Sequence, residues 1–296
     1  MEFLIHIRTL FEGTYTLRIL ENFFELWWKI LPYILISIAL NIVARRTIST
    51  RSLLRPLTGE VSSIVVAALV GLISPLPTYA AIPIALSLMP AGLPFGAVMA
   101  FILSSPLMNP TIFFLTASQL GIEMAAARCV SAFLIAVTGG LLTSRIFTTL
   151  YEPAPASSPL RSPSSTPLLR DIIGNAAYIL KYFSIAILLS SAIRALIPPE
   201  LITTLLGGEG KMGTLLAMAM GIPFYTCGGS AIPFMETLGE LGMHKGPMLA
   251  FFIAGPATKL ETLYAFRSQL GTKVLIFYLI LTFVFSYIAG VLYSIL

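Results

Sequence analysis

Residues 81–121 read AIPIALSLMPAGLPFGAVMAFILSSPLMNPTIFFLTASQLG, and residues 231–271 read AIPFMETLGELGMHKGPMLAFFIAGPATKLETLYAFRSQLG. The second stretch follows the first by 150 positions, aligns with it without a gap and is identical at 13 of 41 positions. The identities include glycines and prolines, which apolar composition alone would not place in register. The chain is therefore expected to consist of two related halves.

The composition around these stretches is that of a membrane protein. Of 296 residues 57% are hydrophobic and 10% are charged, whereas a soluble domain has about 25% charged residues. Apolar segments near 20 residues recur along the chain, which is the length that spans a bilayer as a helix. The net charge of +5 comes from basic residues at segment ends, as in topology signals and unlike a nucleic-acid footprint. We expect an all-α integral membrane protein.

Composition shifts divide the chain into four parts. Residues 1–22 are predicted to be an N-terminal interfacial segment, residues 23–147 the first transmembrane repeat and residues 172–296 the second. The stretch between them, residues 148–171, is rich in Pro and Ser and is predicted to be an extended cytoplasmic linker.

Charge in matching loops indicates how the halves are oriented. The loop after the first apolar segment holds four arginines and one glutamate, whereas its counterpart, residues 198–211, holds two glutamates and one lysine. Because cytoplasmic loops are enriched in basic residues, the two loops are expected on opposite sides of the membrane. We therefore predict inverted repeats of about five helical elements each.

Prolines and glycines interrupt each half at two matching depths. The breaks lie at residues 74–80 and 104–110 in the first half and at 223–230 and 254–261 in the second. Ordinary kinks and close helix packing are one interpretation. Unwound backbone, however, persists in a membrane only where it lines protein or a watery cavity, and paired discontinuous helices at the midplane are typical of a transporter site.

Charged residues lie beside the second-half breaks. Each of Glu236, Lys259 and Glu261 would cost roughly 2.5–3.5 kcal/mol near the bilayer centre. Lys259 and Glu261 are two positions apart and cannot pair on a regular helix. Either the segment is unwound there, or Lys259 pairs elsewhere, with Glu236 or a bound anion. Glu236 and Glu261 are candidates for proton coupling.

The breaks also supply the candidate substrate-binding residues. Half-helix N-termini and the Lys259 ammonium would attract a small anion or polar group. Cys227 is either a small apolar filler or a soft ligand. The full predicted set is Asn109, Tyr225, Cys227, Ser230, Thr258 and Lys259. The two cysteines form no metal or disulfide pattern, so no metal and no cofactor is expected.

Three motifs carry a resemblance to a known family. SPLMNP at residues 105–110, PFYTC at 223–227 and GPAT at 255–258 resemble the predicted permease family that contains the ArsP-type organoarsenical efflux permeases. The resemblance implies efflux of trivalent organoarsenicals, and hence arsenical resistance, across the cell (cytoplasmic) membrane of a prokaryote. Members often carry a Cys-x-Cys pair where this chain has Pro77 and Tyr79, and an Asn where it has Lys259.

The sequence therefore predicts a multi-pass secondary transporter, a permease that exports a small solute such as an organoarsenical or a small anion. The absence of an ATP-binding P-loop from the sequence favours an ion gradient or facilitation as the driving force. The alternatives are a passive channel of paired half-helices, and an intramembrane enzyme using Cys227, for which no nearby histidine base is evident. An enzyme is not expected. The expected partners are a small-molecule or ion substrate and the lipid bilayer, with no nucleic acid, and homo-oligomerisation is left open.

Overall fold

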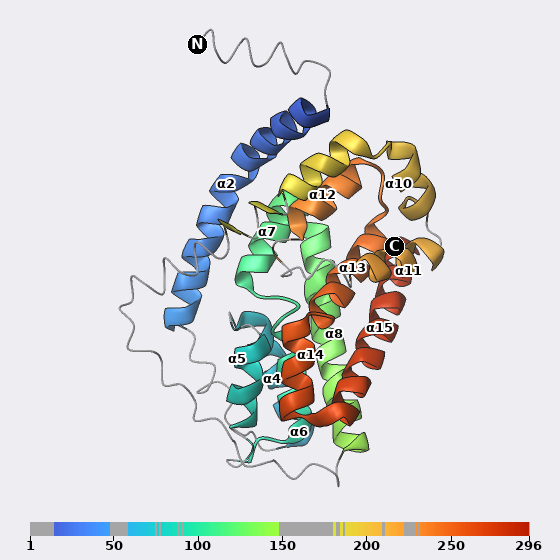
Figure 1. Ribbon diagram of the computed structural model, residues 1–296. Helices are drawn as coiled ribbons and strands as arrows, with labels where there is room; N and C mark the ends of the chain where they lie inside the picture. Colours follow the sequence, from blue (N-terminus) through green and yellow to red (C-terminus); the bar gives the residue numbers. More distant parts are fainter. Residues whose placement is uncertain are drawn as a thin grey trace.

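A computed structural model describes residues 15–47, 59–74, 76, 78–87, 89, 92–147, 180–181, 184–185, 187–208, 211–221, 229 and 231–295. All regular structure in these residues is helical (Figure 1), which confirms the all-α prediction. The first helix, α2 (Tyr15–Thr47), is continuous for 33 residues, so the end of the predicted interfacial segment already belongs to it. The predicted linker lies outside the described residues, and the four domain boundaries stay predictions.

Two of the described helices are long and apolar enough to cross a membrane, α8 (Ile122–Ile146) and α15 (Gly271–Ile295). Each has 25 residues, or about 37 Å of helix, against a hydrocarbon thickness of about 30 Å. A third candidate is the helix Ile187–Leu196 together with α10 (Pro199–Leu206), bent by 105°. The bend falls at Pro198-Pro199, where proline cannot continue a preceding helix.

Each half contains a compact bundle of three helices. In the first half α6 (Phe95–Ser104) packs between α4 (Glu60–Ile73) and α8, and in the second α13 (Lys245–Ala257) packs between α11 (Lys211–Gly221) and α15. Equivalent glycines allow the close approach: a Cβ on Gly96 would meet the Gly140 carbonyl, and a Cβ on Gly246 would meet that of Gly290. Small residues at such contacts let the backbones touch.

The turns repeat as well. Gly92 and Gly242 have φ of 97° and 99°, and Gly121 and Gly271 have φ of 88° and 84°. This left-handed region is readily open only to glycine, which explains why both pairs are among the identical positions. The two halves therefore share local geometry as well as sequence.

The halves exchange contacts reciprocally. α7 (Pro110–Leu120) of the first half packs on α12 (Ile232–Glu240) of the second. Their equivalents, α14 (Leu260–Gln269) and α5 (Thr78–Leu86), pack on each other in the same way. Figure 1 shows the equivalent helices α8 and α15 side by side, running in opposite directions. The inversion of the halves across the membrane stays a prediction.

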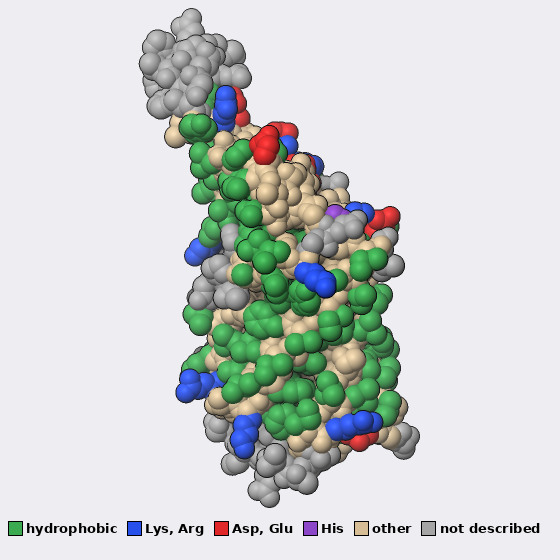
Figure 2. Space-filling model, turned by 90° about the vertical axis from the view of Figure 1, so that its right-hand side faces the viewer, with side chains coloured by type: hydrophobic (Ala, Val, Ile, Leu, Met, Phe, Trp, Pro, Cys, Tyr) green, Lys and Arg blue, Asp and Glu red, His purple; other side chains and the backbone are tan. Residues whose placement is uncertain are grey.

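The surface fits a lipid environment. Figure 2 shows hydrophobic side chains spread over a broad band of the molecule, with most charged side chains toward its two ends. The outward positions of α8 and α15 carry large exposed apolar residues, including Val130, Leu134, Ile280 and Val284. Such a contiguous apolar surface marks a membrane contact, and the chain is a membrane protein.

Candidate functional site

The two first-half breaks meet each other. α4 ends at Ile73 and α6 ends at Ser104, and the Ser105 hydroxyl donates a hydrogen bond to the Leu76 carbonyl over 3.0 Å. Ser105 is almost completely buried. A side chain from one break thus satisfies a backbone group of the other, as apolar surroundings require.

Asn109 begins the half-helix that follows. It is the N-cap of α7, and its Oδ1 accepts a hydrogen bond from the Ile112 N–H over 2.9 Å. Pro110 occupies the first helical position, where a missing N–H costs nothing. Because the Asn109 oxygen is engaged in the cap, its amide N–H₂ group is what the side chain can offer to a ligand.

Lys259 occupies the equivalent position in the second half. It precedes the first residue of α14 with an extended backbone, φ −60° and ψ 134°. The chain is therefore unwound at Lys259. This was one of the two alternatives predicted for the segment that holds Lys259 and Glu261. Lysine has no acceptor atom for capping the N–H groups of α14, and no side-chain cap bond is formed. Its ammonium instead adds a full charge to the positive end of the helix dipole.

Thr258 closes the preceding helix beside Lys259. It is buried, and its hydroxyl donates to the Gly255 carbonyl over 3.2 Å. The hydroxyl oxygen retains its acceptor capacity. Within the described part of the chain Lys259 itself, which is half-buried, makes no ion pair.

Glu236 has a different partner from the one expected. Its Oε1 accepts a hydrogen bond from the Lys29 ammonium at 2.8 Å, and its side chain is only 9% exposed. The alternative in which Lys259 pairs with Glu236 is therefore wrong. Sequence reasoning missed Lys29, although a lysine inside the apolar run Trp27-Trp28-Lys29-Ile30 is a signal that could have found it.

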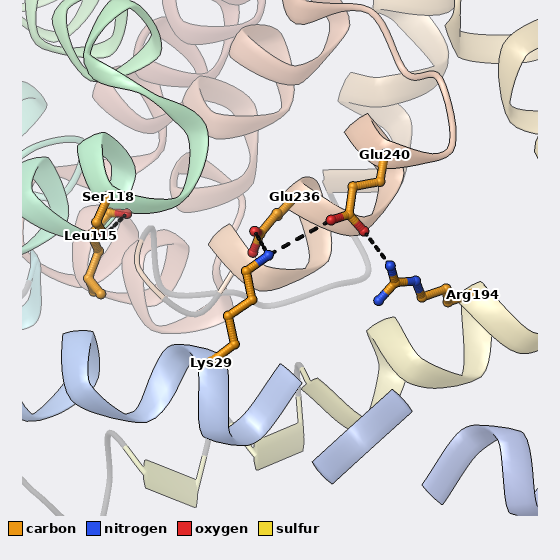
Figure 3. A network of polar contacts seen from close by, with 6 residues as sticks. All are labelled: Lys29, Leu115, Ser118, Arg194, Glu236 and Glu240. Atoms are coloured by element: carbon orange, nitrogen blue, oxygen red, sulfur yellow. Dashed lines mark hydrogen bonds and ion pairs between the residues drawn. The ribbon is translucent and has the colours of Figure 1, made fainter. Parts of the chain in front are cut away.

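Two further charges complete the cluster around Glu236. Figure 3 shows Lys29 reaching from α2 toward both carboxylates of α12, while Arg194 approaches Glu240 from another helix. The Lys29 ammonium lies 3.9 Å from Glu240 Oε1, and the Arg194 guanidinium lies 3.2 Å from Glu240 Oε2. The cluster alternates in sign and joins α2, α12 and the helix Ile187–Leu196.

A buried arginine ties the halves together at another place. Arg128 of α8 is 3% exposed, donates to the Thr116 hydroxyl of α7 over 2.6 Å, and lies 3.8 Å above the Phe252 ring of α13. A guanidinium over an aromatic face is stabilised by the ring quadrupole. Arg128 therefore fixes two helices to the long helix α8. These are α7, which follows the break that ends at Asn109, and α13, which precedes the break that ends at Lys259.

The remaining site predictions are not placed. Tyr225, Cys227 and Ser230 lie outside the described residues, as does the side chain of Glu261. The structure thus describes Asn109, Thr258 and Lys259 at two equivalent helix starts, and it places Glu236 on α12, which packs on the α7 that Asn109 begins. Among described residues, no group of three or more His, Cys, Asp or Glu side chains is arranged to hold a metal.

A family model described as "predicted permease" matches residues 16–295. UPF0718 protein MJ0584 of Methanocaldococcus jannaschii is 34% identical over 112 residues, which cover 36% of this chain and 31% of that protein. The chain thus matches about a third of that relative's length. No solved structure matches.

Proposed function

Because the chain belongs to the predicted permease family, we propose that it is a secondary transporter that exports a small solute through a site between its helix breaks. The match extends over both halves and confirms the resemblance read from the break motifs. Membership in a permease family favours a membrane transporter over an enzyme.

The observation that carries the proposal is the pairing of two interrupted helices. α6 and α7 are separated by a break that ends at Asn109, and α13 and α14 by one that ends at Lys259, 150 positions later. Both breaks place a helix N-terminus, with its unpaired N–H groups and positive dipole end, at equivalent points of the two halves. Half-helix N-termini of this kind hold substrates in inverted-repeat transporters.

The reciprocal packing of the halves supports alternating access. α7 rests on α12 and α14 rests on α5, so each half contributes an element to the other's surroundings. In an inverted repeat, rocking of one half against the other would open the site first to one side and then to the other. The opposite directions of α8 and α15 (Figure 1) are what such a repeat requires.

The chemistry of the breaks favours two solute classes. Lys259 and the two helix N-termini favour a small anion. The thiol of Cys227, in the break predicted at residues 223–230, favours a thiophilic solute such as a trivalent organoarsenical. A site with one thiol and an added ammonium would suit the anion better.

Binding and flux measurements test the proposal. Purified protein would be screened by thermal shift against phenylarsine oxide, arsenate, phosphate, sulfate and small carboxylates. Each compound that raises the melting temperature would then be tested in proteoliposomes for counterflow against a preloaded unlabelled pool. Saturable flux with counterflow is the expected result. Flux that rises linearly with concentration and shows no counterflow would indicate a channel and contradict the proposal.

A further inference from the structure

The ion pair between Lys29 and Glu236 crosses the boundary between the halves. Lys29 belongs to α2 of the first half, whereas Glu236, Glu240 and Arg194 all belong to the second. Figure 3 shows the Lys29 ammonium lying between the two carboxylates of α12. With two cations and two carboxylates, the cluster has no net charge as drawn.

The repeated fold does not need this cluster. The positions equivalent to Glu236 and Glu240 in the first half are Leu86 and Pro90. Features that the fold requires, such as the paired glycines at the turns, recur in both halves. The acidic pair occurs in one half only, so the repeat does not account for it, and a buried carboxylate such as Glu236 marks a candidate functional group.

Glu236 uses only part of its hydrogen-bonding capacity. Its Oε1 accepts from Lys29, but its Oε2 is buried and has no hydrogen-bond partner among the described residues. The hydroxyl of the neighbouring Thr237 is likewise buried and has no hydrogen-bond partner among the described residues. A buried carboxylate normally has its acceptor sites filled, because an unmade bond there is expensive. Oε2 is thus an acceptor to which a proton can add.

The pair acts on the helices that begin at the candidate site. α7 packs on both α2 and α12, and α7 begins at Asn109. α12 begins at Ile232, directly after the break predicted at residues 223–230. A contact between α2 and α12 therefore holds together the elements that flank α7, and its loss would free them to move relative to the site.

We propose that Lys29 and Glu236 form a proton-exchange pair, in which Glu236 accepts the coupling proton and Lys29 is the counter-ion that the proton displaces. The proposal rests on the transport function proposed above and deepens it. Protonation of Glu236 removes the negative charge that holds Lys29, so proton binding is coupled to the position of α2.

The charges balance through the exchange. A proton from water binds Oε2 of Glu236, which becomes neutral, while Lys29 keeps its own proton and its charge. The cluster then carries one net positive charge. The Lys29 side chain is 49% exposed and lies 3.9 Å from Glu240, so it can move to that carboxylate or to water. Loss of the proton from Glu236 reverses both steps.

The other groups around Glu236 do not substitute for Lys29. Arg194 is engaged with Glu240, and α7, which packs on α12, carries no titratable side chain within Pro110–Leu120. Lys245 at the start of α13 pairs with Glu123 at 2.8 Å. In the described part of the chain Lys29 is therefore the cation that pairs with Glu236.

Infrared difference spectroscopy of the protein in lipid nanodiscs tests the exchange without any substrate. The carbonyl band of a protonated carboxyl group would be followed as pH is lowered. We expect a band that is lost in Glu236→Gln. In Lys29→Met it should develop at a pH higher by about 1–3 units, the usual influence of an adjacent opposite charge. Lys29→Arg should titrate close to the wild type.

Lys245→Met is the matched control. It breaks an ion pair of the same 2.8 Å length whose side chains are 61% and 75% exposed, and it should leave the Glu236 band in place. If Lys29→Met is not monodisperse, Lys29→Gln serves instead. An unchanged midpoint in Lys29→Met, or in Lys29→Gln where it takes its place, would overturn the exchange pair while leaving transport untouched. A band that persists in Glu236→Gln would do the same. Absence of transport with the expected titration would instead contradict the proposed function.

Discussion

Lys29 and Glu236 are 207 residues apart in the chain, yet the Lys29 ammonium lies 2.8 Å from a Glu236 oxygen. The carboxylate side of this pair is buried and the lysine side is half-exposed. The two partners therefore differ in what their loss would leave behind. Removing the lysine leaves the buried carboxylate without a counter-ion, whereas removing the carboxylate leaves a lysine that can reach water.

That asymmetry predicts the order of two stability effects. At neutral pH Lys29→Met should lower the apparent melting temperature in detergent more than Glu236→Gln does, and the double variant should recover part of the loss. The measurement is thermal unfolding followed by intrinsic fluorescence. Equal effects, or a larger effect for Glu236→Gln, would show that burial of Glu236 does not depend on Lys29.

The close approach of α13 and α15 predicts a packing effect. Gly246→Ala would push a methyl group into the Gly290 carbonyl and the Ser294 hydroxyl, so it should destabilise the protein by about 1–3 kcal/mol and reduce the folded yield. Gly239→Ala is the control, because its methyl group would meet only the flexible end of Met248. Equal yields and melting temperatures for the two variants would contradict the close contact.

The position of Lys259 predicts a loss of transport. Lys259→Ala should abolish most flux of the transported solute at normal membrane levels, and Lys259→Arg should be partly active because it keeps the charge but not the shape. Lys273→Ala, which removes an exposed lysine from the first turn of α15, should transport normally. Wild-type flux in Lys259→Ala would assign the lysine to a peripheral role.

Cys227 distinguishes the two solute classes. If the solute is recognised by Lys259 and helix ends, Cys227→Ser should be nearly silent, since a hydroxyl fits the same space. If the solute is a trivalent organoarsenical, the same change should abolish resistance, because a hydroxyl cannot match a thiolate for a soft centre. We expect the silent result. Resistance to methylarsenite in cells expressing each variant decides between them, with Cys129→Ser as the control.

Much of the fold could be predicted from the repeat. Gly92, Gly121 and their counterparts mark turns that only glycine tolerates, so their spacing carried over directly into the structure. The break at Ser105-Pro106 was visible because proline acts locally on the backbone. The predicted break at 254–261 was wrong in its first part, because Gly255 and Pro256 still belong to α13 and the helix ends only at Ala257. Local chemistry of this kind is readable from a single sequence.

The partner of Glu236 could not be predicted in the same way. Lys29 comes from the other half of the chain, and nothing in either local sequence specifies which distant helix packs beside which. Likewise the 105° bend after Leu196 depends on two successive prolines whose effect on direction is set by packing. The match to the family model could not reveal the partner of Glu236 or the bend, because it says which family the chain belongs to and nothing about contacts between its helices.

Alternating access requires that the paired breaks form a site that water reaches from both sides of the membrane in turn. Cysteine labelling of Lys259→Cys, in a chain that also carries Cys129→Ser and Cys227→Ser, tests it most directly. A membrane-impermeant maleimide would be applied to right-side-out and to inside-out vesicles. Alternating access predicts labelling from both sides. No labelling from either side, in protein that is labelled once denatured, would contradict it.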